Sequence, residues 1–592
     1  MEDILDGGAF QYGRTASGRR WLAAPFDKAT ADAIVAAQKT NPILANILAA
    51  RGIGPKTVGA FLNPSLREDM PDPFVLAGLD EAVESLGDVI LSGGRIGIFG
   101  DYDVDGVTAA SMLARYFDAI NADRIVYLPD RILEGYGPTA AAFGRLLSDG
   151  ADIIVTVDCG AAAHGPVNDA ASKGAVIVVL DHHLMADDGP TAAKAIVNPN
   201  RPDDQSGLKN LSAAGVVFMA LVALNRSLRE KGFFDDRPEP DLRQWLDLTA
   251  LGLVCDVMEM TGFTRTLVAQ GLKVLDQKTN IGLTALAKRA GAKGAASTYH
   301  LGFLLGPRIN AAGRIGHAQL AFDLLTSSDE THAAQLAERL HIMNADRQAI
   351  EADTLTQAMF EIEQQNRQDD DVIVIALEKA HPGVVGIVAG RLKETYDRPV
   401  LVLSSEKGLA KGSGRSIQGV DLGSVIAALS ADGTLVSGGG HAMAAGLTVV
   451  ADRVDALRTK INGILGHAVA KARRERSYLY QNIVAPTAVS KSMADLLAQA
   501  SPFGPGAPEP MVVLRDLHVE QRRVVGENHL SILFKDALGE AVRAIAFRAV
   551  GEPLDKFLTS GAVVHVLGKV RADDWRGGDH GQLHIVDVAV TG

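Results

Sequence analysis

The sequence predicts an α/β protein built on a doubly wound parallel sheet, and three observations support this. Residues 95–99, 152–157 and 175–180 are short, continuous apolar runs, and the last two are rich in β-branched residues. Such runs are typical of parallel strands that are buried on both faces. Stretches rich in Ala and Leu separate them, as crossover helices would. The length of 592 residues also predicts several domains, because a single core seldom exceeds about 300 residues.

The first predicted domain, residues 1–79, consists of short helices. Residues 42–48 carry apolar side chains at helical spacing, and the turn at 52–55 ends that helix. The doubly wound domain follows and is predicted to occupy residues 80–328.

A long helix is predicted next, because residues 329–366 contain neither Gly nor Pro and keep apolar residues near helical spacing. Such a helix extends about 55 Å at ~1.5 Å per residue, enough to connect two domains. We assign it residues 329–368. A second, smaller α/β domain is predicted at 369–468, with two apolar strands followed by Gly-rich loops.

The C-terminal domain, residues 469–592, is predicted to be a small β-barrel of the OB type. It begins with a basic stretch and a helical piece at 493–500, and the Pro- and Gly-rich segment 502–510 suggests a linker. Short strands alternate with turns afterwards, for example at 530–534 and 563–567.

Composition excludes some classes of protein and leaves the partner open. No apolar run approaches the ~18 residues of a membrane span, and the first twenty residues lack the apolar core of a signal peptide. With only Cys159 and Cys255, no disulfide framework exists, so we expect a protein of the reducing cytoplasm. The net charge of −13 argues against a surface that is positive throughout. A nucleic-acid groove, however, needs only local Lys and Arg.

The most informative motif is the acidic segment that follows the first predicted strand. Asp101, Asp103 and Asp105 alternate with other residues, so in an extended segment their carboxylates share one face. Three like charges on one face repel unless a cation lies between them. The alternative is a solvated acidic turn or a helix N-cap, since Asp-Gly is common in turns.

Three other predicted strand ends carry similar side chains: Asp158, then Asp181-His182-His183, and Asp256 after the apolar run 251–255, which we also predict as a strand. Each alone is explained equally by a helix cap or by core or surface histidines. Because the carboxyl ends of parallel strands share one edge of the sheet, together they predict one site. Carboxylates with imidazole and no thiolate suit Mn²⁺ or Mg²⁺, and there are enough ligands for two cations. Phosphoester hydrolysis is the chemistry that such a pair supports.

In order, Gly100–Thr108, Val157–Gly160, Asp181–His183 and Cys255–Val257 resemble the motifs of the DHH phosphoesterase superfamily and, within it, of the RecJ family of bacterial single-strand-specific exonucleases. The resemblance extends over nearly the whole chain, through segments 131–137, 306–314, 383–389, 412–416, 438–446 and 502–506. Two positions depart from the pattern: Ala380 stands where a tryptophan is expected, and Ala507 where an asparagine is usual.

The resemblance implies a metal-dependent exonuclease that hydrolyses single-stranded DNA 5′→3′ to mononucleotides, in recombination and DNA repair. It also assigns roles. Asp101, Asp103 and Asp158 would hold one metal; Asp105, Asp158, His182 and Asp256 would hold the other. His183 would face the scissile phosphate, and Asp181 would orient a histidine. Water held by the metals would be the nucleophile.

Several residues are expected to bind the DNA. Arg308, Asn310 and Arg314 lie in a Gly- and Pro-bounded segment, predicted as a loop near the scissile phosphate; a buried Arg–carboxylate network is the alternative. The resemblance places Arg131, Ser413 and Arg415 in a pocket for a 5′-phosphate, although 412–416 also suits a turn between strands. His441, after three glycines, fits an anion site or a simple turn. On the barrel, the candidates are Arg522, Arg523, Lys569, Arg571, Trp575 and Arg576, with solvated surface positions as the equal alternative.

Two other functions stay open at this point. One is a DHH-family phosphodiesterase acting on short oligonucleotides, cyclic dinucleotides or polyphosphate; the extra terminal domains favour a long polymer instead. The other is a non-catalytic scaffold, which the complete set of metal-ligand positions disfavours. For the exonuclease, a helicase and a single-strand-binding protein are the expected partners, and a monomer is the expected state.

Overall fold

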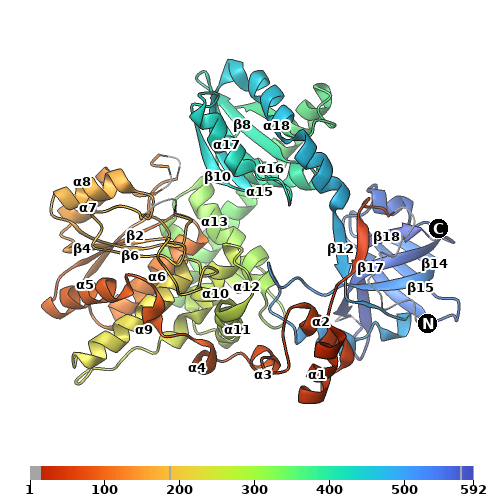
Figure 1. Ribbon diagram of the computed structural model, residues 1–592, viewed down its shortest axis with the longest axis horizontal. Helices are drawn as coiled ribbons and strands as arrows, with labels where there is room; N and C mark the ends of the chain where they lie inside the picture. Colours follow the sequence, from red (N-terminus) through yellow and green to blue (C-terminus); the bar gives the residue numbers. More distant parts are fainter. Residues whose placement is uncertain (1–14, 132, 136, 186–187, 574–575, 591–592) are drawn as a thin grey trace. The chain divides into compact units, whose positions relative to one another are not determined.

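The structure is a computed structural model that describes residues 15–131, 133–135, 137–185, 188–573 and 576–590 (Figure 1). Trp575, one of the candidate DNA-binding residues, lies outside the described residues. The chain divides into two compact units: Ser65–Ala472, and a second unit in which Met1–Pro64 joins Arg473–Gly592. Within the described residues, no helix is both long and apolar enough to span a bilayer.

The first unit contains the predicted doubly wound sheet, in which all five strands are parallel. Their order is β3-β2-β4-β5-β6, with bounds Arg124–Tyr127, Ile96–Gly100, Ile153–Val157, Val176–Leu180 and Ala195–Val197. The direction of winding therefore reverses between β2 and β4. Ligands of open α/β sheets bind beyond the carboxyl ends of the strands at such a reversal.

Helices cover both faces of this sheet (Figure 1). On one face, α7 (Ala140–Ser148) and α8 (His164–Ser172) share a buried cluster with the strands, which includes Phe99 and Phe143. The other face carries α5 (Leu79–Ser92), α6 (Val104–Ala119) and α9 (Ala213–Glu230). The continuous apolar runs of the strands reflect this burial on both sides.

A helical region completes this part of the unit and corrects two predictions. Residues 251–255, predicted as a strand, belong to the buried helix α10 (Leu246–Cys255), which packs against α6, α9 and α11 (Gly262–Gln277). A short apolar run cannot distinguish a strand from a buried helix. Residues 306–314, predicted as a loop, form α13 (Gly306–Ile315). Pro307 fits there because proline is tolerated in the first helical turn.

The remaining helices of this region are α12 (Ile281–Arg289), a short π-helix (His300–Leu305), α14 (Gln319–Thr326) and α15. The predicted long helix is confirmed as α15, 35 residues from Glu330 to Gln364. Asp329 caps its N-terminus by accepting a hydrogen bond from the amide of His332.

The second α/β sheet is also confirmed, with the order β10-β11-β9-β8-β7. β7 (Ile373–Glu378) and β8 (Val400–Glu406) are parallel, and α16 (Val385–Tyr396), α17 (Leu422–Ala431) and α18 (Val454–Glu475) accompany them. The predicted Gly-rich loops are strands instead: β9 (Leu409–Arg415), β10 (Ser437–His441) and β11 (Ala444–Val450). A Cβ on Gly412 would lie 2.0 Å from the carbonyl oxygen of Val402, so glycine permits the close backbone contact there.

The second unit contains the predicted barrel. The strands β14 (Val512–Val525), β15 (His529–Lys535), β16 (Ala541–Ala546), β18 (Gly581–Val590) and β17 (Val563–Ala572) are paired in that order, and β17 pairs with β14 to close the ring. This five-stranded closed barrel is consistent with the OB fold. A short strand β13 (Asn482–Ile483) adds to β14.

The N-terminal helices share one hydrophobic core with this barrel. They are α1 (Lys28–Gln38), α2 (Pro42–Ala50) and α3 (Val58–Leu62), and α19 (Lys491–Ala498) joins them. A strand that the sequence did not predict, β1 (Arg20–Ala23), pairs with β12 (Ser477–Tyr480). Segment 502–510 is not a linker, because Arg51 donates hydrogen bonds to the carbonyls of Ala500 (2.6 Å) and Pro508 (2.7 Å) within the same unit.

Candidate metal centre

The acidic segment after β2 bends into a helix instead of continuing as a strand. Asp101 follows β2, Asp103 is the N-cap of α6 and accepts a hydrogen bond from the amide of Gly106 (3.1 Å), and Asp105 lies in the first helical turn. The predicted alternation on an extended segment is therefore wrong, since α6 begins at Val104. The two interpretations of this motif, a helix N-cap and a candidate cation site, are compatible, because Asp103 caps a helix beside a buried acidic cluster.

The other predicted side chains reach the same place from three elements. Asp158 follows β4 with a left-handed φ of 62°, and Asp181, His182 and His183 follow β5. Asp256 comes from the C-terminus of α10, so a helix end supplies what was predicted as a fourth strand end. Three groups have ligand atoms within 4.8 Å of one another: Asp158–His182–His183, Asp105–His182–Asp256 and Asp101–Asp103–Asp158. The predicted convergence on one edge of the sheet is therefore present.

His182 lies at the centre of this cluster. Its Nε2 atom is 3.2 Å from Oδ1 of Asp158, 3.4 Å from Oδ2 of Asp256 and 3.8 Å from Oδ2 of Asp105. Nε2 of His182 and Oδ2 of Asp256 are buried, and neither has a hydrogen-bond partner among the described residues. Buried polar atoms without a partner are costly. A bound cation would satisfy both atoms.

Burial and mutual repulsion shift the pKa values of these carboxyls upward. Burial, then the charge of Asp103, raises the pKa of Asp105 to about 7, and burial with Asp105 and Asp103 raises the pKa of Asp256 to about 9. Burial and the neighbouring carboxylates raise the pKa of Asp158 well above its ordinary value. Burial lowers the pKa of His182 to about 4, which keeps its imidazole neutral. A cation would reverse this penalty by stabilising the charged carboxylates.

His183 behaves differently because Asp181 holds it. Its Nδ1 atom is 2.7 Å from Oδ1 of Asp181. Burial would lower the pKa of His183, but the hydrogen bond and charge of Asp181 outweigh it and raise that pKa to about 9. Burial would raise the pKa of Asp181, yet His183 and the amide of Ala161 lower it to about 2. The result is a protonated imidazole paired with a carboxylate.

The sequence analysis missed the groups that hold Asp105. Both carboxylate oxygens accept hydrogen bonds from the N-terminus of α9: Ser212 Oγ donates to Oδ1 (2.7 Å), and the amides of Ala213 and Ala214 donate at 2.6 and 3.1 Å. The signal was present, since Ser212 precedes an Ala-rich helical stretch and serine is a preferred N-cap. Here the helix N-terminus orients a carboxylate of the cluster.

The donor set suits a hard divalent cation. It consists of carboxylates and one neutral imidazole, which Mn²⁺ and Mg²⁺ accept. Both cysteines lie close in sequence to these residues, but burial raises the pKa of Cys159 and of Cys255, so neither supplies a thiolate. These residues therefore fit Mn²⁺ or Mg²⁺ better than a zinc ion held by cysteine thiolates.

A group of arginines lies next to the acidic cluster. Burial and the nearby charges of Arg131, Arg347 and Arg415 lower the pKa of Arg314 to about 10. The guanidinium of Arg131 lies over the ring of Tyr102, 5.1 Å from its centroid. Among the described residues, no carboxylate forms an ion pair with Arg131, Arg314 or Arg415. Such a group of like charges without a counter-ion favours an anionic ligand.

Strand β9 places Ser413 and Arg415 beside the first turn of α16. A Cβ on Gly386 would lie 3.1 Å from Nη2 of Arg415 and 3.4 Å from Cβ of Ser413. Arg314 connects the same region to the metal side, since its Nη1 donates to the carbonyl of Gly383 (3.0 Å). Of the three residues of the predicted phosphate pocket, Ser413 and Arg415 thus lie on strand β9, whereas Arg131 lies in the connection between β3 and α7 of the same unit.

Arg308, Asn310 and Arg314 lie on helix α13 and not on the predicted loop. Arg308 and Arg314 are six residues apart on α13, so their side chains leave the helix about 120° apart around its axis. Arg308 donates to Nδ1 of His341 (3.2 Å), whereas Arg314 is affected by the charges of Arg131, Arg347 and Arg415. Asn310 lies between them in sequence and is half-buried.

His441 ends strand β10 and pairs with Ala444 of β11, so it is not part of a glycine-rich anion nest. Its charge is among the causes that lower the pKa of His182, which places it within electrostatic reach of the metal centre. The strand geometry, rather than loop flexibility, positions it.

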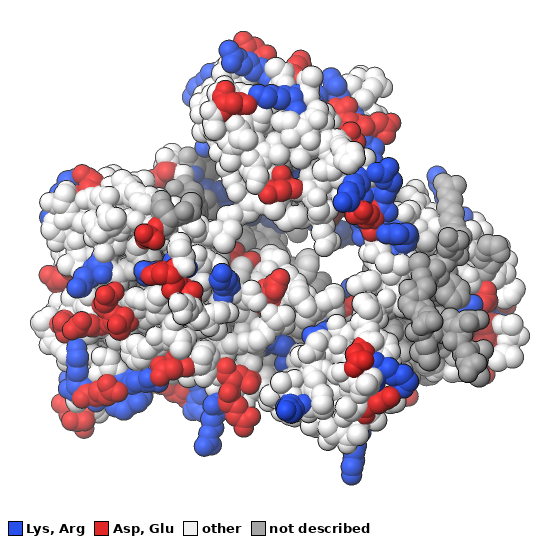
Figure 2. All heavy atoms as spheres, in the orientation of Figure 1, with Lys and Arg blue, Asp and Glu red and all other residues white. Residues whose placement is uncertain are grey.

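Surface charge bears on how the molecule could bind a polyanion. On the face shown in Figure 2, acidic and basic side chains are interspersed, so binding of a polyanion would depend on local groups of arginines such as the one around Arg314.

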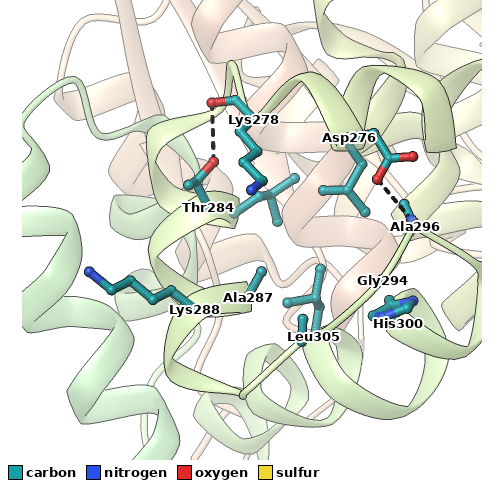
Figure 3. Close-up of a pocket in the computed structure, with 12 residues that line it drawn as sticks. Asp276, Lys278, Thr284, Ala287, Lys288, Gly294, Ala296, His300 and Leu305 are labelled. Atoms are coloured by element: carbon teal, nitrogen blue, oxygen red, sulfur yellow. Dashed lines mark hydrogen bonds between the residues drawn. The ribbon is translucent and has the colours of Figure 1, made fainter. Parts of the chain in front are cut away.

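A cavity of about 370 Å³ lies between α11, α12 and the π-helix (Figure 3). Its lining includes Asp276, Lys278, His300 and Leu305, and none of the metal-site residues.

Comparisons with known proteins agree with this architecture. Three family models match in order: the N-terminal domain of the DHH family at residues 95–253, the DHHA1 domain at 369–467 and the RecJ OB domain at 482–587. The single-stranded-DNA-specific exonuclease RecJ of Dickeya dadantii is 37% identical over 486 residues, which cover 80% of this chain and 83% of the relative.

Solved structures give the same result. Crystal structures of RecJ from Thermus thermophilus were determined with Mn²⁺ and with Mg²⁺. The Mn²⁺ structure has a TM-score of 0.80 at 30% identity and covers 97% of this chain and 80% of that one. The Mg²⁺ structure has a TM-score of 0.74 at 29% identity and covers 96% and 78%.

Proposed function

Because this chain belongs to the RecJ family of single-stranded-DNA-specific exonucleases, we propose that it degrades single-stranded DNA from the 5′ end and releases mononucleotides. It is a single-stranded-DNA-specific exonuclease of the DHH class. The observation that carries the proposal is the buried carboxylate–imidazole cluster, in which Nε2 of His182 has no hydrogen-bond partner among the described residues. Arg314 and its neighbouring arginines lie next to it, and within the described part of the chain no carboxylate pairs with Arg131, Arg314 or Arg415.

Two divalent cations, Mn²⁺ or Mg²⁺, are the proposed cofactors. Asp101, Asp103 and Asp158 would hold one; Asp105, Asp158, His182 and Asp256 would hold the other. The three groups of adjacent ligand atoms support this division, because Asp158 belongs to two of them. When bound, a metal pair of this kind polarises the phosphate and activates water for in-line attack.

Residues around the proposed cations orient the ligands and supply a positively charged imidazole. Asp105 is fixed by three hydrogen bonds from α9, so its carboxylate needs no rearrangement to bind. Asp181 keeps His183 protonated, and we assign to that imidazolium a hydrogen bond to a non-bridging oxygen of the scissile phosphate. This bond would strengthen as negative charge develops on that oxygen.

We assign the 5′→3′ polarity to the arginine group. A terminal phosphate carries more negative charge than an internal one, and Arg131, Arg415 and Ser413 offer guanidinium and hydroxyl donors for it. Arg314 would contact the same strand. Binding of the terminus there fixes its distance from the metal centre, so the first phosphodiester is the one presented for cleavage.

Digestion of end-labelled DNA tests the function. We expect the protein with Mn²⁺ to release mononucleotides from 5′-phosphorylated single strands, to cut 5′-hydroxyl strands more slowly, and to leave blunt duplexes intact. EDTA should abolish the activity. Cleavage only from the 3′ end would overturn the polarity, and preference for dinucleotides over long strands would support a short-substrate phosphodiesterase instead.

Family membership is the basis for the wider role that we propose, in recombination and DNA repair. A helicase that exposes single strands and a single-strand-binding protein that coats them are the corresponding partners. A monomer would suffice, because all the site residues named here come from one chain.

A further inference from the structure

Two exposed aromatic rings stack on each other, one at the N-cap of the π-helix that precedes α13 and one within that helix. Tyr299 and Phe303 are 58% and 70% exposed. Their ring centroids are 5.5 Å apart, and the ring planes differ by 19°. Aromatic side chains contribute most to the stability of a core or an interface when their large apolar faces are buried. A stacked pair with this exposure therefore offers an aromatic surface to a partner.

The segment that carries these rings is held in place at several points. Nδ1 of His300 is 2.8 Å from the hydroxyl of Ser297, and its Nε2 is 2.9 Å from the carbonyl of Lys293. His300 and Leu305 line the cavity in Figure 3. Leu301 and Leu305 are buried. The rings thus project from an ordered support.

The same segment is attached to the metal centre. The thiol of Cys255 donates to the carbonyl of Leu301 (3.6 Å), and Cys255 immediately precedes Asp256. A Cβ on Gly306 would lie 2.4 Å from the sulfur of Cys255, so the start of α13 packs tightly on the end of α10. Any ligand on the two rings is therefore bound at a defined position relative to Asp256.

A basic side chain follows the rings along the same segment. Arg308, five residues after Phe303, donates to the carbonyl of Leu304 (2.6 Å) and to His341 (3.2 Å). Its pKa is lowered by burial and by the charge of Arg289, and it has no carboxylate ion-pair partner within the part of the chain that the structure describes. Aromatic faces and a basic side chain on one segment are the combination that binds single-stranded nucleic acid.

We propose that Tyr299 and Phe303 form a base-stacking site for the single-stranded substrate, with Arg308 contacting an adjacent phosphate. A base in a single strand can expose its face to these rings, whereas a base inside a duplex is stacked on both sides. The site would thus add to selectivity for single strands without reading sequence. The inference rests on the proposed function and extends it to a contact outside the metal centre and the 5′-phosphate pocket.

Base-free DNA provides the test. Two 5′-phosphorylated oligonucleotides of equal length are compared, one complete and one with abasic nucleotides beyond the 5′-terminal few. For the unaltered enzyme, the abasic strand should have the higher KM. Combining Tyr299→Leu with Phe303→Leu should raise the KM for the complete strand about tenfold and leave the abasic strand nearly unchanged. Phe303→Tyr should retain normal KM values.

Phe360→Leu on α15 is the matched control, because Phe360 is also 58% exposed. It should change neither KM. Equal KM values for the two strands with the unaltered enzyme would overturn the stacking site while leaving the exonuclease assignment intact. A double variant that loses activity equally on both strands and melts at a lower temperature would also overturn it, by identifying the rings as an internal packing surface. Failure of the unaltered enzyme to digest either strand would instead contradict the proposed function.

Discussion

Oδ1 of Asp158 lies 3.2 Å from Nε2 of His182, although the two residues follow different strands, β4 and β5. Both side chains are buried, and the Nε2 atom has no hydrogen-bond partner among the described residues. At least one of these two residues belongs to each of the three groups of candidate ligands. In the metal-free protein the carboxylates of this site therefore repel one another, and bound cations would offset that repulsion.

Asp158→Asn should abolish activity and stabilise the metal-free fold. Asp158 is the ligand that we propose both cations share, and its loss should remove several kcal/mol of transition-state stabilisation, so kcat should fall by at least about 10³-fold. The neutral amide also removes one repelling charge from the cluster, so the melting temperature in EDTA should rise. Asp346→Asn on the exposed face of α15 serves as the control. Retained activity in Asp158→Asn would refute the metal assignment.

The metal-free protein should lose stability as the pH rises. The pKa of Asp105, about 7, and that of Asp256, about 9, exceed the ordinary value of 3.8. Groups with a raised pKa in the folded state favour folding while protonated, and this contribution disappears as the pH rises through those two values. Urea unfolding in EDTA should therefore give a lower free energy of unfolding at pH 9 than at pH 5.

Divalent metal should counteract this loss, because it replaces protons on the carboxylates. Mn²⁺ at 100 times its dissociation constant adds about 2.7 kcal/mol to the free energy of unfolding. Asp256→Asn should flatten the pH dependence in EDTA. A free energy of unfolding that increases from pH 5 to pH 9 without metal would contradict the electrostatic account.

Asp181→Asn should slow catalysis without removing a proposed ligand. The asparagine cannot supply the charge that, with the 2.7 Å hydrogen bond, keeps the pKa of His183 at about 9, so burial should dominate and lower it. Loss of such an orienting partner typically costs about 10- to 100-fold in activity. NMR titration of His183 in the metal-free protein would follow the pKa, and kcat would follow the effect. A shifted pKa with unchanged kcat would exclude a role for the imidazolium.

Gly106→Ala should displace the acidic segment. A Cβ at this position would lie 2.6 Å from the carbonyl oxygen of Asp101, which is backbone and cannot rotate away. We expect a loss of about 1 to 3 kcal/mol in stability and weaker Mn²⁺ binding, measured by urea unfolding and calorimetry. Gly144→Ala in α7 is the control, since its Cβ would meet open space, and it should be neutral or stabilise by up to about 1 kcal/mol. Equal behaviour of the two variants would show that the segment adapts.

Arg415→Gln should weaken the preference for a 5′-phosphate. A charge-assisted hydrogen bond contributes about 1.5 to 3 kcal/mol, so the KM for 5′-phosphorylated strands should rise roughly 10- to 150-fold. The KM for 5′-hydroxyl strands should change little. Lys411→Gln, on the same strand and exposed, is the control. An equal rise for both kinds of strand would place Arg415 on an internal phosphate instead.

The sequence alone determined the sheet, the long helix, the barrel and the membership of the acidic cluster. Those features depend on local patterns. Parallel strands such as 153–157 are buried on both faces and therefore show as apolar runs, and the ends of such strands must share one edge. The helical periodicity of α15, uninterrupted by Gly or Pro, is equally local.

Only the tertiary structure decided the elements that packing controls. Residues 251–255 are as apolar as a strand, but helices on several sides make them part of α10, so Asp256 enters the site from a helix end. The hydrogen bonds from α9 to Asp105, the separation of Arg308 from Arg314 and the stacking of Tyr299 on Phe303 depend likewise on how helices lie in space. Such relationships depend on contacts between residues distant in sequence or on the direction in which a helix presents its side chains, and no local pattern specifies them.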